Sequence, residues 1–413
     1  MKTLLLLLVS FNSLAATRLD FQDLESLVKN RNKKVSASVI EFRGMEQRTG
    51  YLKRSFIPTG EAWVGQERFK TGNFGTMTEP LYSLRANLNL YRGGRDSLEE
   101  NSRVAQKNNM SVQAEQVYQE ELFEVRELYW NLIYYREIYK LYEDAKKKNE
   151  VNLDRAKRRV NAGLATSVDS LEFEISETQL NQDLARITVS MATLQRRISA
   201  VIGLDPETLY ETIEEIPHDH ADQTPNLTMD FNLFRDVRLE MTNSMDFEAR
   251  GKMAKRWWTP SFDLYGESVL YNYRERTFNK QNDQVDNALG FRLSFNFDGL
   301  QMKYDGDALE AKSQASKLRA EQIKMEAEAA FNTAKQELAL LHDLIHVGEK
   351  NVSKGAEYLR RTQEEYARGV KNSPDVLSAN LKQLEFRRRF AELRRDYAIA
   401  KAQIGSLMAS SDD

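Results

Sequence analysis

The sequence contains no cysteine, and its 413 residues include only seven prolines. Without cysteine there can be no disulfide bond, no thiolate nucleophile and no cysteine-ligated metal, which is compatible with an oxidising compartment. The formal net charge is only −3, so the chain offers no basic field for a nucleic acid. No glycine-rich phosphate loop, nucleophile elbow or zinc motif is present, and we therefore expect neither an enzyme nor a cofactor.

Long apolar runs are also scarce, and the clearest one stands at the N-terminus. Met1-Lys2-Thr3 precedes the apolar run Leu4–Val9, and small residues follow at Ser13–Ala16. A charged start, a short apolar core and small residues predict a secretory signal peptide over residues 1–15, cleaved after Ala15 or Ala16. No later segment approaches the roughly 18–20 apolar residues of a membrane helix. An exported protein without such a helix is either soluble or a β-barrel.

The helical regions are unusually long. From Arg95 to Leu204 there is no proline, and the only glycines are Gly163 and Gly203. The stretch before Gly163 is rich in strong helix formers. After an interruption at 161–169, apolar residues recur from Leu180 to Val201 at alternating spacings of four and three, which is typical of a coiled-coil seam. We predict a long antiparallel helical hairpin over about 95–203.

Two segments alternate between apolar and polar residues instead. Tyr82–Leu90 and Leu289–Phe297 each place apolar side chains on one side and polar ones on the other. A period of two over about ten residues fits a tilted strand across a bilayer, although a single such segment is better explained by an ordinary half-buried sheet strand. Strands are predicted over about 59–70, 81–91, 260–271 and 288–298. Polar loops are predicted at 71–80 and 272–287, and preceding helices at 21–55 and 229–256.

The same succession of predicted helices and strands occurs twice in the chain. Gly93 and Gly299, Gly163 and Gly369, and Asp169 and Asp375 are each separated by 206 residues, which indicates a duplicated unit of helix, strand, strand and long helical hairpin. The first repeat covers 16–203, an acidic connector covers 204–226, and the second repeat covers 227–413, with its hairpin at about 300–406. The predicted fold class is mostly α with a transmembrane β part.

Four strands cannot close a barrel, and an open sheet edge in hydrocarbon leaves backbone groups unsatisfied at several kcal/mol each. Copies of the chain must therefore share one barrel. Two copies would supply eight strands and three would supply twelve; the residue pattern does not choose between them.

Short motifs at the strand ends and hairpin tips complete the pattern. They are Ile57-Pro58, Thr259-Pro260, Tyr91–Gly94, Phe297–Gly299, the first tip Ala162–Asp169 and the second tip Tyr366–Leu377. In order and spacing the chain resembles the TolC family of outer-membrane efflux proteins. The resemblance implies a homotrimer with a twelve-stranded β-barrel in outer-membrane lipid and a twelve-helix α-barrel across the periplasm. It also implies a passive exit duct for an inner-membrane pump of the RND or ABC type, joined through a periplasmic adaptor (membrane fusion) protein, as in efflux or type I secretion.

The hairpin tips are the candidate functional site. From the residues alone, Gly163 and Gly369 are expected to end helices in left-handed turns, and Asp169 and Asp375 to cap the helices that follow. The resemblance adds a periplasmic gate made of Asp169, Tyr366, Lys371 and Asp375. Lys371 stands where the family has arginine, so a weaker latch is expected, and Ser378 replaces a second acidic position. The tip residues implied to contact the adaptor are Ala162, Gly163, Leu164, Arg368, Gly369 and Val370.

Other candidates are weaker. His342 and His346 lie one helical turn apart and could share a metal, but no third ligand is in view; His218 and His220 fall in an acidic loop. The aromatic residues between Tyr129 and Tyr142 are better explained by helix packing. The alternative function is a soluble periplasmic coiled-coil scaffold, which would expose the apolar strand faces to water. The sequence leaves open the exported substrate, the particular adaptor and pump, and whether the resting state is open or closed.

Overall fold

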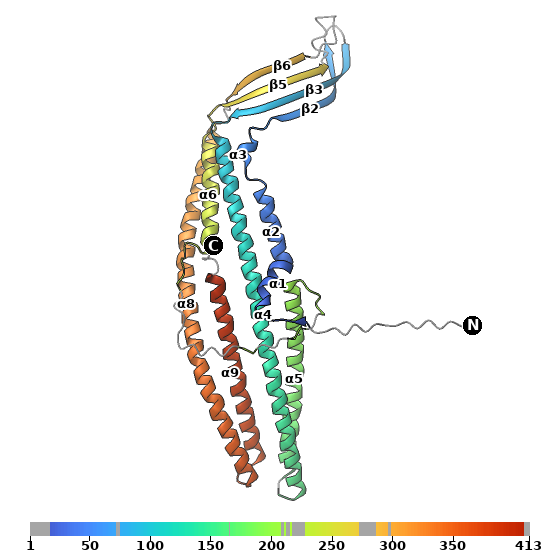
Figure 1. The fold of residues 1–413 in the computed structure, drawn as a ribbon, viewed down its shortest axis with the longest axis vertical. Helices are drawn as coiled ribbons and strands as arrows, with labels where there is room; N and C mark the ends of the chain where they lie inside the picture. The colour runs from blue at the N-terminus through green and yellow to red at the C-terminus, as the bar shows by residue number, and fades with distance from the viewer. Residues whose placement is uncertain are drawn as a thin grey trace, which may run out of the picture. The chain divides into compact units, whose positions relative to one another are not determined.

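The computed structural model describes residues 17–71, 75–164, 166–207, 210–211, 215–216, 228–271, 286–295 and 299–408. The predicted signal peptide, the segment with His218 and His220, and nearly all of the predicted loop 272–287 lie outside these residues. The fold is mostly helical with a small antiparallel sheet (Figure 1). Among the described residues, none of the helices is apolar over a length that could span a membrane.

The chain divides into two compact units, which are described separately. The first unit contains Met1–Ser38, Ala114–Phe234 and Met325–Asp413, and the second contains Val39–Gln113 and Arg235–Lys324. The division cuts across the long helices, so parts of α4 (Arg95–Asn161) and α8 (Gly299–Ala367) belong to each unit.

The sheet belongs to the second unit. Its strands are β2 (Thr59–Thr71), β3 (Gly75–Tyr91), β5 (Ser261–Tyr271) and β6 (Asp286–Ser294). They pair antiparallel in the order β2-β3-β5-β6. The predicted loop at 71–80 is wrong for most of its length, because β3 already pairs with β2 from the Thr71–Gly75 register onward. Glycine and threonine in that segment suggested a loop, but the cross-strand ladder overrides this local preference.

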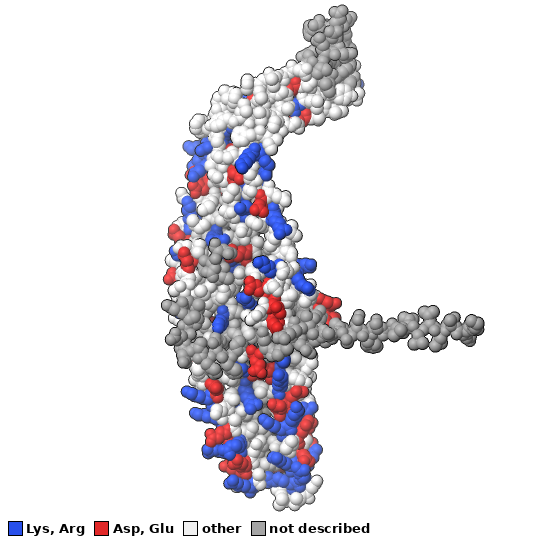
Figure 2. All heavy atoms as spheres, in the orientation of Figure 1, with Lys and Arg blue, Asp and Glu red and all other residues white. Residues whose placement is uncertain are grey.

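The register sorts the side chains into two faces. Leu84 lies opposite Ala62 and Ser268, and Leu264 lies opposite Leu88 and Phe291, so these positions share one face, which is largely apolar. That face is uncovered in the single chain, where Leu289 is 81% exposed and Phe291 69%. Figure 2 shows the visible part of the sheet with few charged side chains and the helices covered with both signs.

The opposite face of the sheet is polar and charged. Arg85 lies between Glu61 and Glu267 in register, and its guanidinium is 2.8 Å from the Glu267 carboxylate. Arg292 lies over the ring of Tyr265, with 4.7 Å between the guanidinium carbon and the ring centroid. The predicted two-residue alternation therefore separates an apolar face from a hydrophilic one.

The predicted single helix over 21–55 is wrong. The structure has α1 (Asp23–Arg31), α2 (Lys33–Glu46) and α3 (Tyr51–Arg54). Asn32 breaks the first junction, with an extended ψ of 128° and a side-chain oxygen that accepts the Val35 N–H at 2.9 Å. Gly50 breaks the second junction with a left-handed φ of 76°. In the second half, α6 (Arg235–Lys255) begins at Arg235 rather than at Met229.

Each of the two long helices is followed by a shorter helix that packs back against it. α5 (Ser167–Ile202) packs against α4, where the Asn149 side chain donates to the Phe173 carbonyl at 2.8 Å. Likewise α9 (Ser373–Met408) packs against α8, and a Cβ placed on Gly355 would lie 2.4 Å from Oε1 of Gln383. The predicted seam of α5 faces inward, with Leu180, Ile187 and Ile198 buried.

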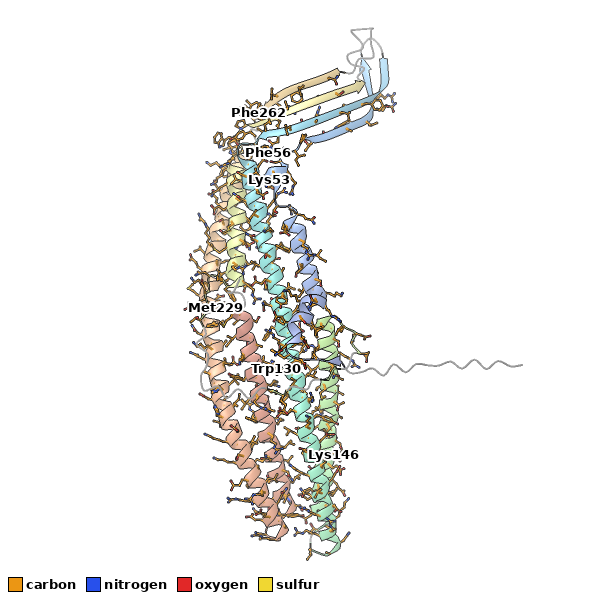
Figure 3. All side chains as sticks on the ribbon, in the orientation of Figure 1. Lys53, Phe56, Trp130, Lys146, Met229 and Phe262 are labelled. Atoms are coloured by element: carbon orange, nitrogen blue, oxygen red, sulfur yellow. The ribbon has the colours of Figure 1, made fainter. Side chains whose placement is uncertain are left out.

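The main core of the first unit surrounds the aromatic segment of α4. Tyr129 and Trp130 are buried with Phe21 beside them, and Figure 3 labels Trp130 on α4. This confirms that helix packing explains these aromatics. Asn32 donates to Glu121 and to the Val201 carbonyl, each at 2.7 Å. The short parallel pair β1 (Thr17–Arg18) and β4 (Tyr210–Glu211) was not predicted.

Candidate functional site at the hairpin tips

The first tip is a turn closed by backbone hydrogen bonds. The Gly163 N–H donates to the Val160 carbonyl at 3.0 Å, and the Leu164 N–H donates to the Arg159 carbonyl at 2.8 Å. This pair of bonds is the Schellman motif, which requires a left-handed residue, and Gly163 has a φ of 70°. Glycine ends α4 because it adopts that φ without strain.

The second tip repeats the same turn. The Gly369 N–H donates to the Tyr366 carbonyl and the Val370 N–H to the Glu365 carbonyl, both at 3.0 Å, with φ 78° at Gly369. The predicted left-handed turns are therefore confirmed at both tips. No atom beyond the adjoining residues lies within 4 Å of a Cβ built on either glycine, so backbone conformation alone selects glycine there.

Both following helices begin with a capping box. The Thr166 N–H donates to Oδ2 of Asp169 at 3.0 Å, and Asp169 N–H donates to the Thr166 carbonyl and side chain. At the second tip the Asn372 N–H donates to Asp375 Oδ2, and the Asp375 N–H donates to Asn372 Oδ1, each at 3.2 Å. The predicted capping roles of Asp169 and Asp375 are confirmed.

Asp169 has a further partner on the other hairpin. Ser373, the first residue of α9, lies close enough for its backbone N–H and hydroxyl to lower the pKa of the Asp169 carboxyl. Burial raises the pKa of the Asp169 carboxyl, but the hydrogen bonds from Thr166 and Ser373 outweigh it, and the net pKa is lowered. Asp169 therefore lies beside Ser373 of the other hairpin as an ionised carboxylate.

The side chain of Tyr366 is buried between the helices of the two hairpins. Its side chain is only 5% exposed and packs in a cluster with Leu153, Ala156, Phe173 and Val376. The Arg159 guanidinium lies over the ring, 4.6 Å from its centroid, and donates to the Tyr366 carbonyl at 3.2 Å. The hydroxyl of Tyr366 lies 3.3 Å from the Ser373 hydroxyl.

Lys371 and Asp375 face each other within the second tip, with 3.8 Å between the ammonium and the carboxylate. Both are partly exposed, so the pair is worth no more than about 1 kcal/mol. Within one chain the structure thus brings Asp169 to Ser373 and Lys371 to Asp375. The predicted contacts between Asp169 of one hairpin and the Lys371 and Tyr366 of another stay a prediction.

Sequence reasoning missed Ser373 and Arg159. Ser373 is 1% exposed and lies near both Asp169 and the Tyr366 hydroxyl. The only feature of the sequence that could have indicated its role is its position directly after the capping residue Asn372. Arg159 belonged to a run of charged residues that gave no indication of stacking on Tyr366.

The tips also display apolar side chains. Leu164 is 71% exposed and Val370 73%, at corresponding places just beyond the two glycines. In a Schellman motif this residue often packs on the residue that accepts its N–H bond, but Arg159 and Glu365 occupy those positions. A groove of about 580 Å³ between α5 and α9 adjoins this region, and Ile175, Leu377 and Leu381 line it.

The structure gives little support to the histidines as metal ligands. The rings of His342 and His346 are 4.9 Å apart, but the described residues contain no group of three histidine, aspartate or glutamate side chains able to hold a metal ion. His218 and His220 lie outside the described residues.

The fold and a sequence match define the class of protein. The sequence model of the family "Outer membrane efflux protein" matches residues 53–204. Among curated protein sequences none matches the chain. The solved structure of the outer membrane protein VceC from Vibrio cholerae is 14% identical, with a TM-score of 0.78 over 94% of this chain and 95% of that chain.

Two further channels have the same fold. The outer-membrane channel OprN is 13% identical, with a TM-score of 0.80 over 94% of this chain and 90% of that chain. The CmeC outer membrane channel of Campylobacter jejuni is 11% identical, with a TM-score of 0.79 over 95% of this chain and 86% of that chain. At these identities the likeness shows the fold.

Residues 53–204 thus match the model of the outer membrane efflux protein family, and the chain as a whole has the fold of these channels. The resemblance to the TolC family is confirmed. The matched family and the similar solved structures are outer membrane proteins, in agreement with the predicted location. The family is one of channels and not of enzymes.

Proposed function

We propose that three copies of the chain form an outer-membrane exit duct for substrates expelled by an inner-membrane pump through a periplasmic adaptor. The observation that carries the proposal is the sheet. From Tyr82 onward β3, and likewise β5 and β6, gather exposed apolar side chains on one face and charged ones on the other, and β2 and β6 stand at the edges of the sheet. Twelve such strands from three copies would satisfy both edges, turn the apolar face to lipid and enclose a polar lumen.

The duplication supports this proposal. Residues 16–203 and 227–413 would be two versions of one unit, each giving two strands and one hairpin, so that each copy contributes four helices to a twelve-helix tunnel. The soluble periplasmic scaffold is not favoured, because it would leave side chains such as Leu289 and Phe291 in water.

The test compares neighbouring strand positions. Leu88→Lys and Leu293→Lys place charge on the apolar face, and we expect each to cost about 2–4 kcal/mol near the bilayer midplane and to abolish most trimer in outer-membrane fractions. The matched control Asn87→Lys lies on the polar face and should leave trimer yield unchanged. Equal yields from both faces, or recovery of the wild type as a soluble periplasmic protein, would refute the barrel.

The hairpin tips would form the gate of this duct. Asp169, Tyr366, Lys371 and Asp375 lie within the tips, and in a trimer the Lys371 of one copy would meet the Asp169 of another. Each pair is worth at most about 1 kcal/mol. Three pairs can still shift the ratio of closed to open channels by about a hundredfold, at about 1.4 kcal/mol per factor of ten.

Conductance in planar bilayers tests the gate. Lys371→Glu should raise single-channel conductance without loss of trimer, and Asp169→Lys with Lys371→Asp should restore part of the closed behaviour. Asp375→Asn should instead lower cation preference, because it removes a ring of charge. Wild-type conductance in Lys371→Glu would remove Lys371 from the gate.

The adaptor would contact the tip turns at Ala162, Gly163, Leu164, Arg368, Gly369 and Val370. The exposed apolar pair Leu164 and Val370 supports this assignment. Leu164→Ser with Val370→Ser should weaken adaptor binding while the trimer survives. Unchanged adaptor binding in a pull-down from outer membranes would contradict the assignment.

A further inference from the structure

A basic hollow of about 460 Å³ lies among α4, α8 and α9 in the first unit. None of the residues that line it is acidic. Five of them are cationic: Lys147, Lys148, Arg155, Arg360 and Arg387. The volume falls in the usual range of small-molecule pockets, roughly 300–1,000 Å³.

The cations of the hollow differ from their neighbours on the same helix. Lys146 lies 4.0 Å from Glu150, Lys157 lies 3.1 Å from Glu174, and Arg158 lies 2.7 Å from Asp154; Figure 3 labels Lys146 on α4. None of these three lines the hollow.

Inside the hollow the cations are almost all without counter-charge. Only Arg360 has an ion-pair partner among the described residues, Glu364 at 2.7 Å. Lys147, Lys148, Arg155 and Arg387 have none there. Lys147, Lys148 and Arg155 of this segment of α4 therefore all bring positive charge without an ion-pair partner to the hollow.

Two buried amides face the same hollow. Asn152 is 3% exposed and Gln383 is 5% exposed. Neither Nδ2 of Asn152 nor either side-chain polar atom of Gln383 has a hydrogen-bond partner among the described residues. A buried polar group left unpaired costs about 1–3 kcal/mol, so such groups call for an occupant.

A glycine makes room for one of these amides. Gly355 of α8 lies against Gln383, and a Cβ there would lie 2.4 Å from Oε1. The backbone of α8 therefore approaches α9 closely enough to hold the Gln383 side chain beside the hollow.

From the charge, the size and the unpaired amides we propose that this hollow is a binding site for a small, multiply charged anion that carries phosphate or carboxylate groups. The cations of α4, α8 and α9 supply charge-assisted hydrogen bonds, and the amide N–H groups of Asn152 and Gln383 donate beside them. A hollow of this volume suits a small ligand and not an extended polymer. The site does not depend on the proposed exit duct.

The test is calorimetric titration of full-length, detergent-solubilised protein with pyrophosphate and with citrate. The variant with Lys147→Gln, Lys148→Gln and Arg155→Gln should bind at least tenfold more weakly. The control with Lys146→Gln, Lys157→Gln and Arg158→Gln removes the same charge from the same turns and should bind within twofold of wild type. Equal losses in both variants, or no binding of either anion at millimolar concentration, would overturn the proposal.

Gln383→Leu separates binding from folding. Leucine has a similar volume and leaves no unpaired polar atom, so the unliganded variant should melt at the wild-type temperature or above it. Its affinity for pyrophosphate should fall at least threefold. An acidic helical peptide that binds where neither pyrophosphate nor citrate does would overturn the small-anion site and assign the hollow to a protein partner.

Discussion

Val160 and Tyr366 stand at corresponding positions of the two hairpin tips, 206 residues apart, yet only Tyr366 is deeply buried. The turns around them are built alike, with a left-handed glycine and a capping box in each. What differs is the long-range contact. Ser373 of the second tip is buried and receives Asp169 of the first, whereas Ser167, its counterpart, is exposed.

This difference shows that duplicated sequences can share a local structure and diverge in their tertiary roles. Each turn follows from four or five residues of its own tip. The second tip is held by a packed aromatic ring, which also receives Arg159 and Phe173 of the first hairpin. We therefore expect matched substitutions in the two tips to have unequal effects.

The largest difference should come from the aromatic ring. Tyr366→Ala removes a buried side chain from the cluster with Phe173 and Val376 and should cost about 3–5 kcal/mol of folding free energy. Val160→Ala should cost about 1 kcal/mol, because Val160 is partly exposed. Thermal unfolding and hydrogen exchange of the tip peptides measure both effects.

Tyr366→Phe is the control for packing. It keeps the ring and loses only the 3.3 Å contact with the Ser373 hydroxyl, so its cost should stay near 1 kcal/mol. If Val160→Ala and Tyr366→Ala proved equally destabilising, the proposed asymmetry of the tips would be wrong.

The glycines provide the next comparison. Gly163→Ala and Gly369→Ala meet no neighbouring atom and should each cost about 1–2 kcal/mol from the left-handed φ alone. Gly203 ends α5 in the same motif, but a Cβ there would lie 2.6 Å from the Arg31 carbonyl oxygen. Gly203→Ala should therefore be the most destabilising of the three in chemical denaturation. An equal loss at all three positions would mean that the backbone near Arg31 moves aside.

Removal of the capping carboxylates should have smaller effects. Asp169→Ala loses both the capping box and the hydrogen bonds from Ser373, and should cost about 1–2 kcal/mol. Asp375→Ala loses a capping box and a partly exposed contact with Lys371, and should cost about 1 kcal/mol. Hydrogen exchange at the starts of α5 and α9 compares them. A greater loss with Asp375→Ala would reverse the assignment of Asp169 as the link between tips.

These contrasts also show which features of the fold and of the tips can be predicted from the sequence. The turns and caps were predictable because Gly163, Gly369, Asp169 and Asp375 act within a few residues of themselves. The polar and apolar faces of the strands were predictable from a period of two. Long-range contacts were not: Ser373 and Arg159 have no local pattern that points to Asp169 or Tyr366. The breaks at Asn32 and Gly50 were missed because residues 21–55 were interpreted as one helix that ends before Ile57-Pro58.

The smallest expected effect is a dependence of the tip contact on pH. Burial opposes ionisation of Asp169, but hydrogen bonds from Thr166 and Ser373 lower its pKa below the ordinary 3.8. A carboxyl with a lowered folded-state pKa stabilises the fold fully above its unfolded pKa and loses that contribution as pH falls through the folded value. Tip stability should thus be constant from neutral pH to about pH 5 and decline below pH 3.8. Hydrogen exchange at Thr166 and Ser373, corrected for the intrinsic rate, should show this decline in the wild type and not in Asp169→Asn. A decline that persists in Asp169→Asn would place the titrating group elsewhere.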